Sequence, residues 1–125
     1  MVAHGEVKRV LVADDSDTVT TVLVTALEME GYQVDTAHNG IDAYEMGRAG
    51  QYDLVILDHL MPGLLGLEIM ERWRAEGHQI ATIVLSGVDD DRIAVDTLEV
   101  GAVDFVRKPF RIPELMARIR SRLRD

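Results

Sequence analysis

Oxygen-bearing side chains and one lysine each follow a short apolar run of this sequence. They are Asp14, Asp15, Asp58, Ser86 and Lys108. Carboxylates that lie close together repel one another unless a cation joins them, and hard oxygen ligands favour Mg²⁺. A metal ion, a lysine and a hydroxyl donor around one carboxylate form a site for a phosphoryl group, and that carboxylate can itself be the nucleophile. These residue types therefore predict an acyl phosphate, provided that the fold brings them together.

Each of these residues also has a purely structural interpretation when it is taken alone. Asp14 and Asp15 could cap a helix, and Asp58 could be a solvated loop acid. Ser86 and Lys108 could simply lie where strands end. The functional interpretation is favoured because several separate strand ends would otherwise have to carry residues suited to a phosphoryl site by chance.

Short β-type runs alternate with longer helical patterns along the whole chain. Strands are expected at residues 10–13, 34–37, 54–57, 80–85 and 105–106. Helices are expected between the cap candidates Ser16 and Asp17 and the terminating Gly31, and at residues 41–49, 66–76, 90–100 and 112–123. Two of the strands are continuous apolar blocks, which suits strands buried on both faces of a parallel sheet.

This alternation predicts an α/β fold with five βα units and a doubly wound, five-stranded parallel sheet. Such a sheet commonly has the strand order 2-1-3-4-5 and binds ligands beyond the carboxyl ends of strands 1 and 3. Asp14, Asp15 and Asp58 follow those two strands. The fold class and the chemistry therefore point to the same edge of the sheet.

The composition predicts one domain over residues 1–125, either free-standing or cut from a longer protein, because a chain of 125 residues with 47% hydrophobic residues can bury a core of its own. The absence of cysteine excludes a disulfide scaffold, a thiolate zinc site and a catalytic cysteine. A net charge of −9 argues against direct nucleic-acid binding. No apolar run approaches the roughly 20 residues of a bilayer span, so we expect a cytoplasmic protein without membrane contact.

The basic residues gather at the C-terminal end, where residues 107–125 hold seven basic and two acidic side chains. Two interpretations are open. Arginines in a final helix can complement the helix dipole and lie in solvent, or they can form a face for a partner. We favour the first, because these arginines are spaced for a helix surface.

Four segments of the sequence resemble the receiver domain of two-component response regulators, and together they extend over most of the chain. They read VLVADD at 10–15, DHLMPG at 58–63, VLSG at 84–87 and DFVRKPF at 104–110. The resemblance implies a CheY-like, flavodoxin-like fold. It also implies a phosphorylation-dependent signalling switch, which catalyses only its own phosphoryl transfer and dephosphorylation and is not otherwise an enzyme.

The resemblance assigns roles to the acidic residues. Asp58 matches the phosphoacceptor that takes a phosphoryl group from a sensor histidine kinase or a phosphotransfer protein. Asp14 and Asp15 match the acidic pair that holds Mg²⁺ together with Asp58 and the backbone carbonyl of Leu60. Mn²⁺ is the expected substitute for Mg²⁺.

The resemblance also implies how the domain would bind a phosphoryl group and change conformation in response. Lys108 matches the lysine that binds the phosphoryl group, and its peptide bond to Pro109 is expected to be cis. Ser86 matches the switch hydroxyl, and Phe105 matches the aromatic ring whose rotamer follows it. The face made by the fourth helix, the fifth strand and the fifth helix would then change, to regulate an output domain or target protein or to form a homodimer.

Three residues depart from the family's usual pattern. Leu65 stands where Asp or Asn usually precedes Gly66, so the loop after the third strand is expected to turn differently. His59 could tune metal binding or phosphate hydrolysis, or it could be a solvated loop histidine, which we favour because adjacent side chains in an extended segment diverge. Val88 offers no acid or amide to orient water, which predicts slower or altered self-dephosphorylation.

Three other classes of protein remain as alternatives. An FMN carrier of the same strand order needs a Ser/Thr/Gly-rich phosphate loop and flanking aromatic rings, but the loop here is diacidic and aromatic residues make up only 5%. An aspartyl-phosphate hydrolase needs an acid or base two residues after its nucleophile, where this chain has Leu60. A pseudo-receiver without phosphorylation is disfavoured by the complete acidic set and by Lys108.

Overall fold

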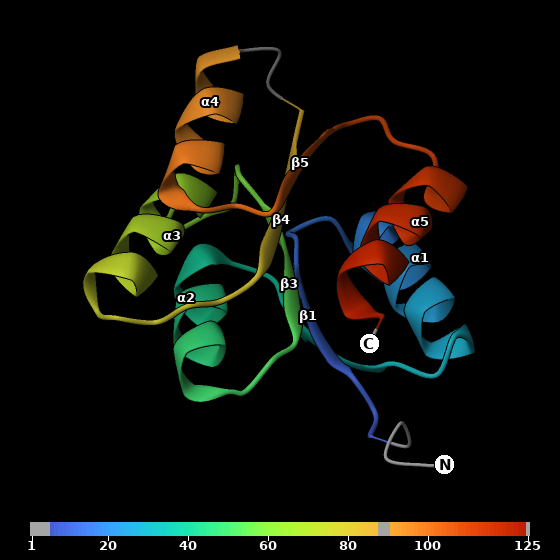
Figure 1. The fold of residues 1–125 in the computed structure, drawn as a ribbon. Coiled ribbons are helices and arrows are strands. Elements are labelled where there is room, and N and C mark those ends of the chain that lie inside the picture. The colour runs from blue at the N-terminus through green and yellow to red at the C-terminus, as the bar shows by residue number, and fades with distance from the viewer. Residues whose placement is uncertain (1–5, 88–90, 125) are drawn as a thin grey trace.

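The computed structural model describes residues 6–87 and 91–124, and these form a five-stranded parallel sheet flanked by helices (Figure 1). The strands are β1 (Arg9–Ala13), β2 (Gln33–Ala37), β3 (Leu54–Asp58), β4 (Thr82–Ser86) and β5 (Asp104–Arg107). The helices are α1 (Asp17–Met29), α2 (Gly40–Ala49), α3 (Gly66–Ala75), α4 (Asp91–Val100) and α5 (Ile112–Leu123). The strand order is β2-β1-β3-β4-β5, which confirms the predicted doubly wound sheet.

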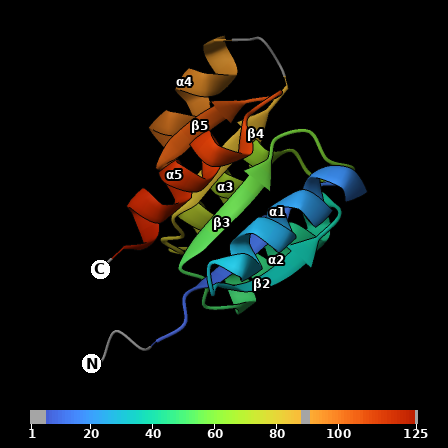
Figure 2. The ribbon, with the colours of Figure 1, turned by 90° about the vertical axis from the view of Figure 1, so that its right-hand side faces the viewer.

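Two hydrophobic layers hold the helices against the sheet. Helices α1 and α5 cover one face, and α2, α3 and α4 cover the other (Figures 1 and 2). Successive side chains of a strand point to opposite faces, so Val10 and Val12 join the α1/α5 layer while Leu11 joins the other. Every residue of β3 is buried, which explains why residues 54–57 form an unbroken apolar run before Asp58.

Helix signals in the sequence mark the ends of α1 correctly. The Ser16 side chain accepts a hydrogen bond from the Val19 backbone N–H at 3.3 Å and so caps the helix. Gly31 follows the other end with a φ of 90°, a conformation that glycine adopts at little cost. These local interactions need no distant partner, so the sequence alone predicts them.

The predicted start of the fourth strand is wrong by two residues. Sheet pairing begins where Thr82 lies opposite Val55, and β4 then continues through Ser86. The side-chain hydroxyl of Thr82 donates to the backbone carbonyl of Ile80 at 2.9 Å, just before the strand. An apolar pattern shows which residues are buried, but only the position of the neighbouring strand decides where pairing begins.

Two arginines of α5, Arg118 and Arg120, are half-exposed and form ion pairs, which supports the interpretation of a solvent-facing helix surface. Arg118 contacts Asp104 at 2.9 Å, and Arg120 contacts Glu30 at 2.8 Å. Exposed pairs of this kind contribute little to stability, commonly below about 1 kcal/mol. Within residues 6–87 and 91–124, no helix has the length and apolar character required to cross a bilayer.

Adding a methyl group at Gly40 is expected to destabilise the protein. A Cβ there would lie 2.2 Å from the Leu64 carbonyl oxygen, so α2 or the loop after β3 would have to shift. We expect Gly40→Ala to lower the free energy of unfolding by about 2 kcal/mol in a urea titration. Gly87→Ala is the control, because its Cβ would meet only the Lys108 Cβ, at 3.9 Å. Equal stability of the two variants would contradict this packing.

Candidate functional site

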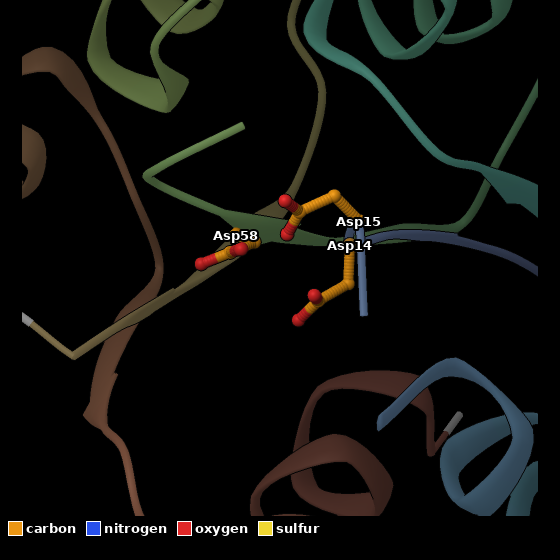
Figure 3. Close-up of side chains that lie close together, drawn as sticks. All are labelled: Asp14, Asp15 and Asp58. Atoms are coloured by element: carbon orange, nitrogen blue, oxygen red, sulfur yellow. The ribbon is translucent and has the colours of Figure 1, made fainter. Parts of the chain in front are cut away.

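Three carboxylates meet at the carboxyl-terminal edge of the sheet. Asp14 and Asp15 follow β1 directly, and Asp58 is the last residue of β3. The two strands are hydrogen-bonded neighbours, with Ala13 opposite Leu57, so their ends lie at the same height. Each of the three acids offers an oxygen atom within 4.8 Å of the others, and Figure 3 shows their side chains gathered together. The predicted convergence of these acids is confirmed.

The three carboxylates differ in their exposure to solvent. Asp14 is completely buried and Asp58 is only 4% exposed, whereas Asp15 is exposed. Burying an ionised carboxylate is unfavourable unless hydrogen bonds or opposite charges compensate. The structure provides such contacts for Asp14 and, in part, for Asp58.

Asp14 is held by backbone groups around it. Its side chain accepts a hydrogen bond from the Ser16 backbone N–H at 2.9 Å. Its own backbone N–H donates to the carbonyl of Ala37 at 3.1 Å, and its carbonyl accepts from the Thr20 hydroxyl at 3.3 Å. These contacts join the end of β1 to β2 and α1, so Asp14 has a defined orientation.

Lys108 lies directly between the two buried carboxylates. Its Nζ is 2.8 Å from an oxygen of Asp14 and 3.3 Å from an oxygen of Asp58. Lys108 follows β5, where its backbone N–H donates to the Ser86 carbonyl at 2.8 Å. The peptide bond to Pro109 is cis, as the resemblance predicted. One ammonium group from the fifth strand end therefore reaches the acids of the first and third.

Burial dominates the electrostatics of Asp58. Burial raises its pKa, the nearby Asp14 carboxylate raises it further, and Lys108 opposes both, with a resulting pKa of about 6. For Lys108, burial alone would lower the pKa, but the hydrogen bond to Asp14 and the charge of Asp58 outweigh it and the pKa is raised. Asp58 is therefore an ionised nucleophile above about pH 6, and Lys108 is a cation.

The donor set fits a divalent metal ion. All the side-chain ligands are carboxylate oxygens, which are the ligands that Mg²⁺ prefers. Three ionised carboxylates beside one ammonium leave two negative charges without a partner in the site, which a divalent cation would neutralise. Leu60, whose backbone carbonyl is the other expected ligand, lies two residues beyond Asp58 in the loop that follows β3.

The two expected switch residues lie on the neighbouring strands. Ser86 ends β4 and is completely buried at the same edge as Asp58. Phe105 lies in β5 opposite Val84, two residues before the end of that strand pair, and is partly buried against the α2/α3/α4 layer. The Arg107 guanidinium lies over the Phe105 ring, 5.5 Å from its centroid. Val88 falls outside the described residues, so the expectation about self-dephosphorylation stays a prediction.

The prediction of a solvated His59 is wrong. Its side chain is only 3% exposed, and Nδ1 accepts a hydrogen bond from the Leu67 backbone N–H at 3.4 Å. Burial lowers the pKa of His59. The His59 side chain contacts the start of α3 instead of solvent. Leu65, which cannot cap that helix, was the signal in the sequence that could have indicated this contact.

The chain matches known proteins over most of its length. The family model for the response regulator receiver domain matches residues 10–120. A transcriptional regulatory protein of Bacillus subtilis, YkoG, is 42% identical over 116 residues, which are 93% of this chain and 51% of that protein. The transcriptional regulatory protein PcoR of Escherichia coli is 40% identical over 117 residues, which are 94% of this chain and 52% of that protein. The chain thus spans about half the length of these curated relatives.

Solved structures agree with this match. The receiver domain of the Francisella response regulator 1452 has a TM-score of 0.86 at 30% identity, over 92% of this chain and 95% of that one. The response regulator TrrA of Thermotoga maritima, solved in complex with Mg²⁺ and BeF, has a TM-score of 0.81 at 36% identity, over 93% of this chain and 99% of that one. The chain therefore belongs to the receiver domains of two-component response regulators, which are signalling domains rather than conventional enzymes.

Proposed function

We propose that Asp58 accepts a phosphoryl group from a sensor histidine kinase or a phosphotransfer protein, and that the whole of residues 1–125 acts as one phosphorylation switch. The observation that carries this proposal is the buried Asp58 carboxylate, which shares an acidic cluster with Asp14 and Asp15 and lies 3.3 Å from the ammonium of Lys108. A buried nucleophile beside a fixed cation is suited to an anionic substrate.

The transfer needs no general base in this chain. An oxygen of Asp58 forms a bond to phosphorus while the bond from phosphorus to the donor imidazole nitrogen breaks. The imidazole leaves with the bonding electrons and takes up a proton. With a pKa of about 6, Asp58 is already ionised at neutral pH. Lys108 then holds the oxygens of the transferred group, in place of its present contact with the Asp58 carboxylate.

Asp14, Asp15, Asp58 and the backbone carbonyl of Leu60 would hold Mg²⁺, and Mn²⁺ could replace it. When bound, the ion supplies positive charge for the oxygens of the transferred phosphoryl group. The role of the chain is to hold the carboxylates in place, with Asp14 fixed by the Ser16 N–H. Asp15 is the exposed member and is open to an ion that enters from solvent.

The response to phosphorylation would begin at Ser86 and Phe105. A phosphoryl group adds about −1.5 to −2 charge and new acceptor oxygens at the edge of the sheet. The Ser86 hydroxyl would turn to donate to one of them, and Phe105 would move into the space that this leaves. The α4–β5–α5 face would then regulate an output domain or target protein, or form a homodimer. A cytoplasmic location and the absence of direct nucleic-acid contact stay predictions from the sequence.

Acetyl phosphate with Mg²⁺ tests the proposal, with intact-protein mass spectrometry as the measurement. We expect the wild-type chain to gain one phosphoryl group and Asp58→Asn to gain none, because an amide oxygen is a poor nucleophile and forms no acyl phosphate. Asp17→Asn is the matched control, since Asp17 opens α1 beside the site and its side chain is almost fully exposed. Equal labelling of the wild type and Asp58→Asn would refute the assignment of the phosphoacceptor.

A further inference from the structure

Helix α3 begins without a side chain that could cap it from the usual position. The N-cap residue is Leu65, whose side chain has no hydrogen-bond acceptor. The first backbone N–H groups of a helix have no partner within the helix and need acceptors from elsewhere. The Leu65 N–H donates to the Glu68 carboxylate at 3.0 Å, which satisfies the first of them. The next two must find acceptors outside the helix.

His59 provides both of those acceptors. The N–H of Gly66 donates to the backbone carbonyl of His59 at 2.8 Å. The N–H of Leu67 donates to the imidazole Nδ1 of His59 at 3.4 Å, a long contact that brings a ring acceptor to the place of a missing cap. With 3% of its surface exposed, the His59 side chain is enclosed at this helix end. A residue seven positions before the first helical residue therefore takes over the capping of α3.

Close backbone packing supports the same contact. A Cβ placed on Gly66 would lie 2.9 Å from the His59 Cα, so the first residue of α3 rests directly on the chain that leaves β3. The His59 N–H also donates to the Leu85 carbonyl of β4 at 2.8 Å. His59 thus ties the end of β3 to β4 on one side and to α3 on the other.

These contacts define the loop that contains Leu60. One end of the loop is fixed at His59, and its middle is fixed where the Gly40 N–H of α2 donates to the Pro62 carbonyl at 2.8 Å. Leu60 lies between these two anchors. The orientation of its backbone carbonyl therefore depends on how firmly His59 is held.

We propose that His59 is a positioning residue: its imidazole caps α3 in place of Leu65 and thereby fixes the loop that presents the Leu60 carbonyl to a bound Mg²⁺. The part that concerns Mg²⁺ rests on the function proposed above. The capping of α3 does not, and it can be tested without metal.

A matched pair of variants separates capping from packing. Asparagine carries an acceptor oxygen on Cγ, where histidine carries Nδ1. Leucine has nearly the same shape as asparagine but no acceptor. In Mg²⁺-free buffer we expect the folding equilibrium constant of His59→Asn to exceed that of His59→Leu about fivefold, the usual effect of one cap. If the buried site only needs an apolar side chain, His59→Leu will be the more stable of the two, and the proposal fails.

Restoring a cap at Leu65 provides a second, independent test. Leu65→Asp should raise the folding equilibrium constant of His59→Leu about fivefold and that of the wild type much less, because His59 already serves the same N–H groups there. An equal effect of Leu65→Asp in both backgrounds would mean that His59 does not accept hydrogen bonds from the N–H groups that the introduced aspartate caps, and it would contradict the proposal. In the wild type, ¹⁵N NMR of the imidazole should show an unprotonated Nδ1. A proton on Nδ1 would also overturn the proposal.

Mg²⁺ titration by calorimetry tests the positioning of Leu60. We expect His59→Leu to weaken Mg²⁺ binding on the order of tenfold, as is typical when a residue that orients a ligand is lost, and Leu65→Asp to recover most of this in the double variant. Unchanged affinity in His59→Leu would refute the positioning role. A wild-type protein that binds no Mg²⁺ would instead contradict the proposed function, while the metal-free experiments would still decide whether His59 caps α3.

Discussion

Replacing Lys108 by methionine is expected to lower the free energy of unfolding by about 3 kcal/mol at neutral pH without Mg²⁺. The Lys108 ammonium is 2.8 Å from Asp14 and 3.3 Å from Asp58, and both carboxylates are buried. Methionine has a similar length but no charge, so the two acids would face each other without a cation. Urea unfolding at pH 7.5 in the presence of a chelator would measure the loss.

Two conditions should reduce this loss. Mg²⁺ should reduce the loss, because the variant, which lacks the Lys108 ammonium, is expected to bind the cation more tightly than the wild type and so gains more stability from it. Lower pH would also reduce the loss, because protonation of Asp58 removes one of the two repelling charges.

Arg111→Met serves as the control, since Arg111 is an exposed cation just before α5 and its loss should change stability by less than about 0.5 kcal/mol. Similar stability of the two variants would mean that Lys108 does not compensate the buried acids.

Asp58→Asn is expected to stabilise the metal-free protein above pH 6, on the order of 2–3 kcal/mol. The pKa of Asp58 in the folded protein is raised from 3.8 to about 6, mainly by burial and by Asp14, and despite the attraction of Lys108. A carboxyl group whose pKa is raised by folding favours the folded state while it is protonated. That contribution is complete below pH 3.8 and is lost as the pH rises through 6. Asparagine stays neutral and keeps the contribution at every pH.

The measurement is the difference in unfolding free energy between Asp58→Asn and the wild type from pH 4 to pH 8, with a chelator present. The difference should be small at pH 4 and should rise to its full value above pH 7, since one pKa unit corresponds to 1.36 kcal/mol. Asp17→Asn, with an exposed side chain, should show no such rise. Saturating Mg²⁺ should reverse the order, because the wild type offers the ion a charged carboxylate where the variant offers only a neutral amide oxygen. A pH-independent difference would contradict the raised pKa of Asp58.

Tertiary packing explains why the environment of Asp58 differs from that of Asp15. Both acids lie at the same sheet edge, yet Asp15 is exposed and Asp58 is 4% exposed. The difference arises because β3 lies in the middle of the sheet with layers on both faces, whereas the chain after β1 turns outward toward α1.

The gathering of the acids, in contrast, follows from local patterns. The apolar blocks before Asp14 and Asp58 identify buried parallel strands, and the strand order common to such doubly wound sheets places those two strands next to each other. Strand ends that are neighbours present their next residues at one edge. The same argument places Ser86 at the end of β4 and Lys108 directly after β5. The structure has both residues, like Asp14 and Asp58, at these strand ends.

Alternating apolar runs and turn residues along the chain thus determine that the sheet is parallel, and the strand order common to such sheets predicts the edge at which Asp14, Asp15 and Asp58 meet. Only the tertiary structure decides that His59 is buried and caps α3, and that Lys108 lies within 3.3 Å of both buried acids. The physical reason is the range of the interactions. Periodicity and caps act between residues close in sequence, whereas burial and ion pairing depend on segments that are far apart in the chain and adjacent in the fold.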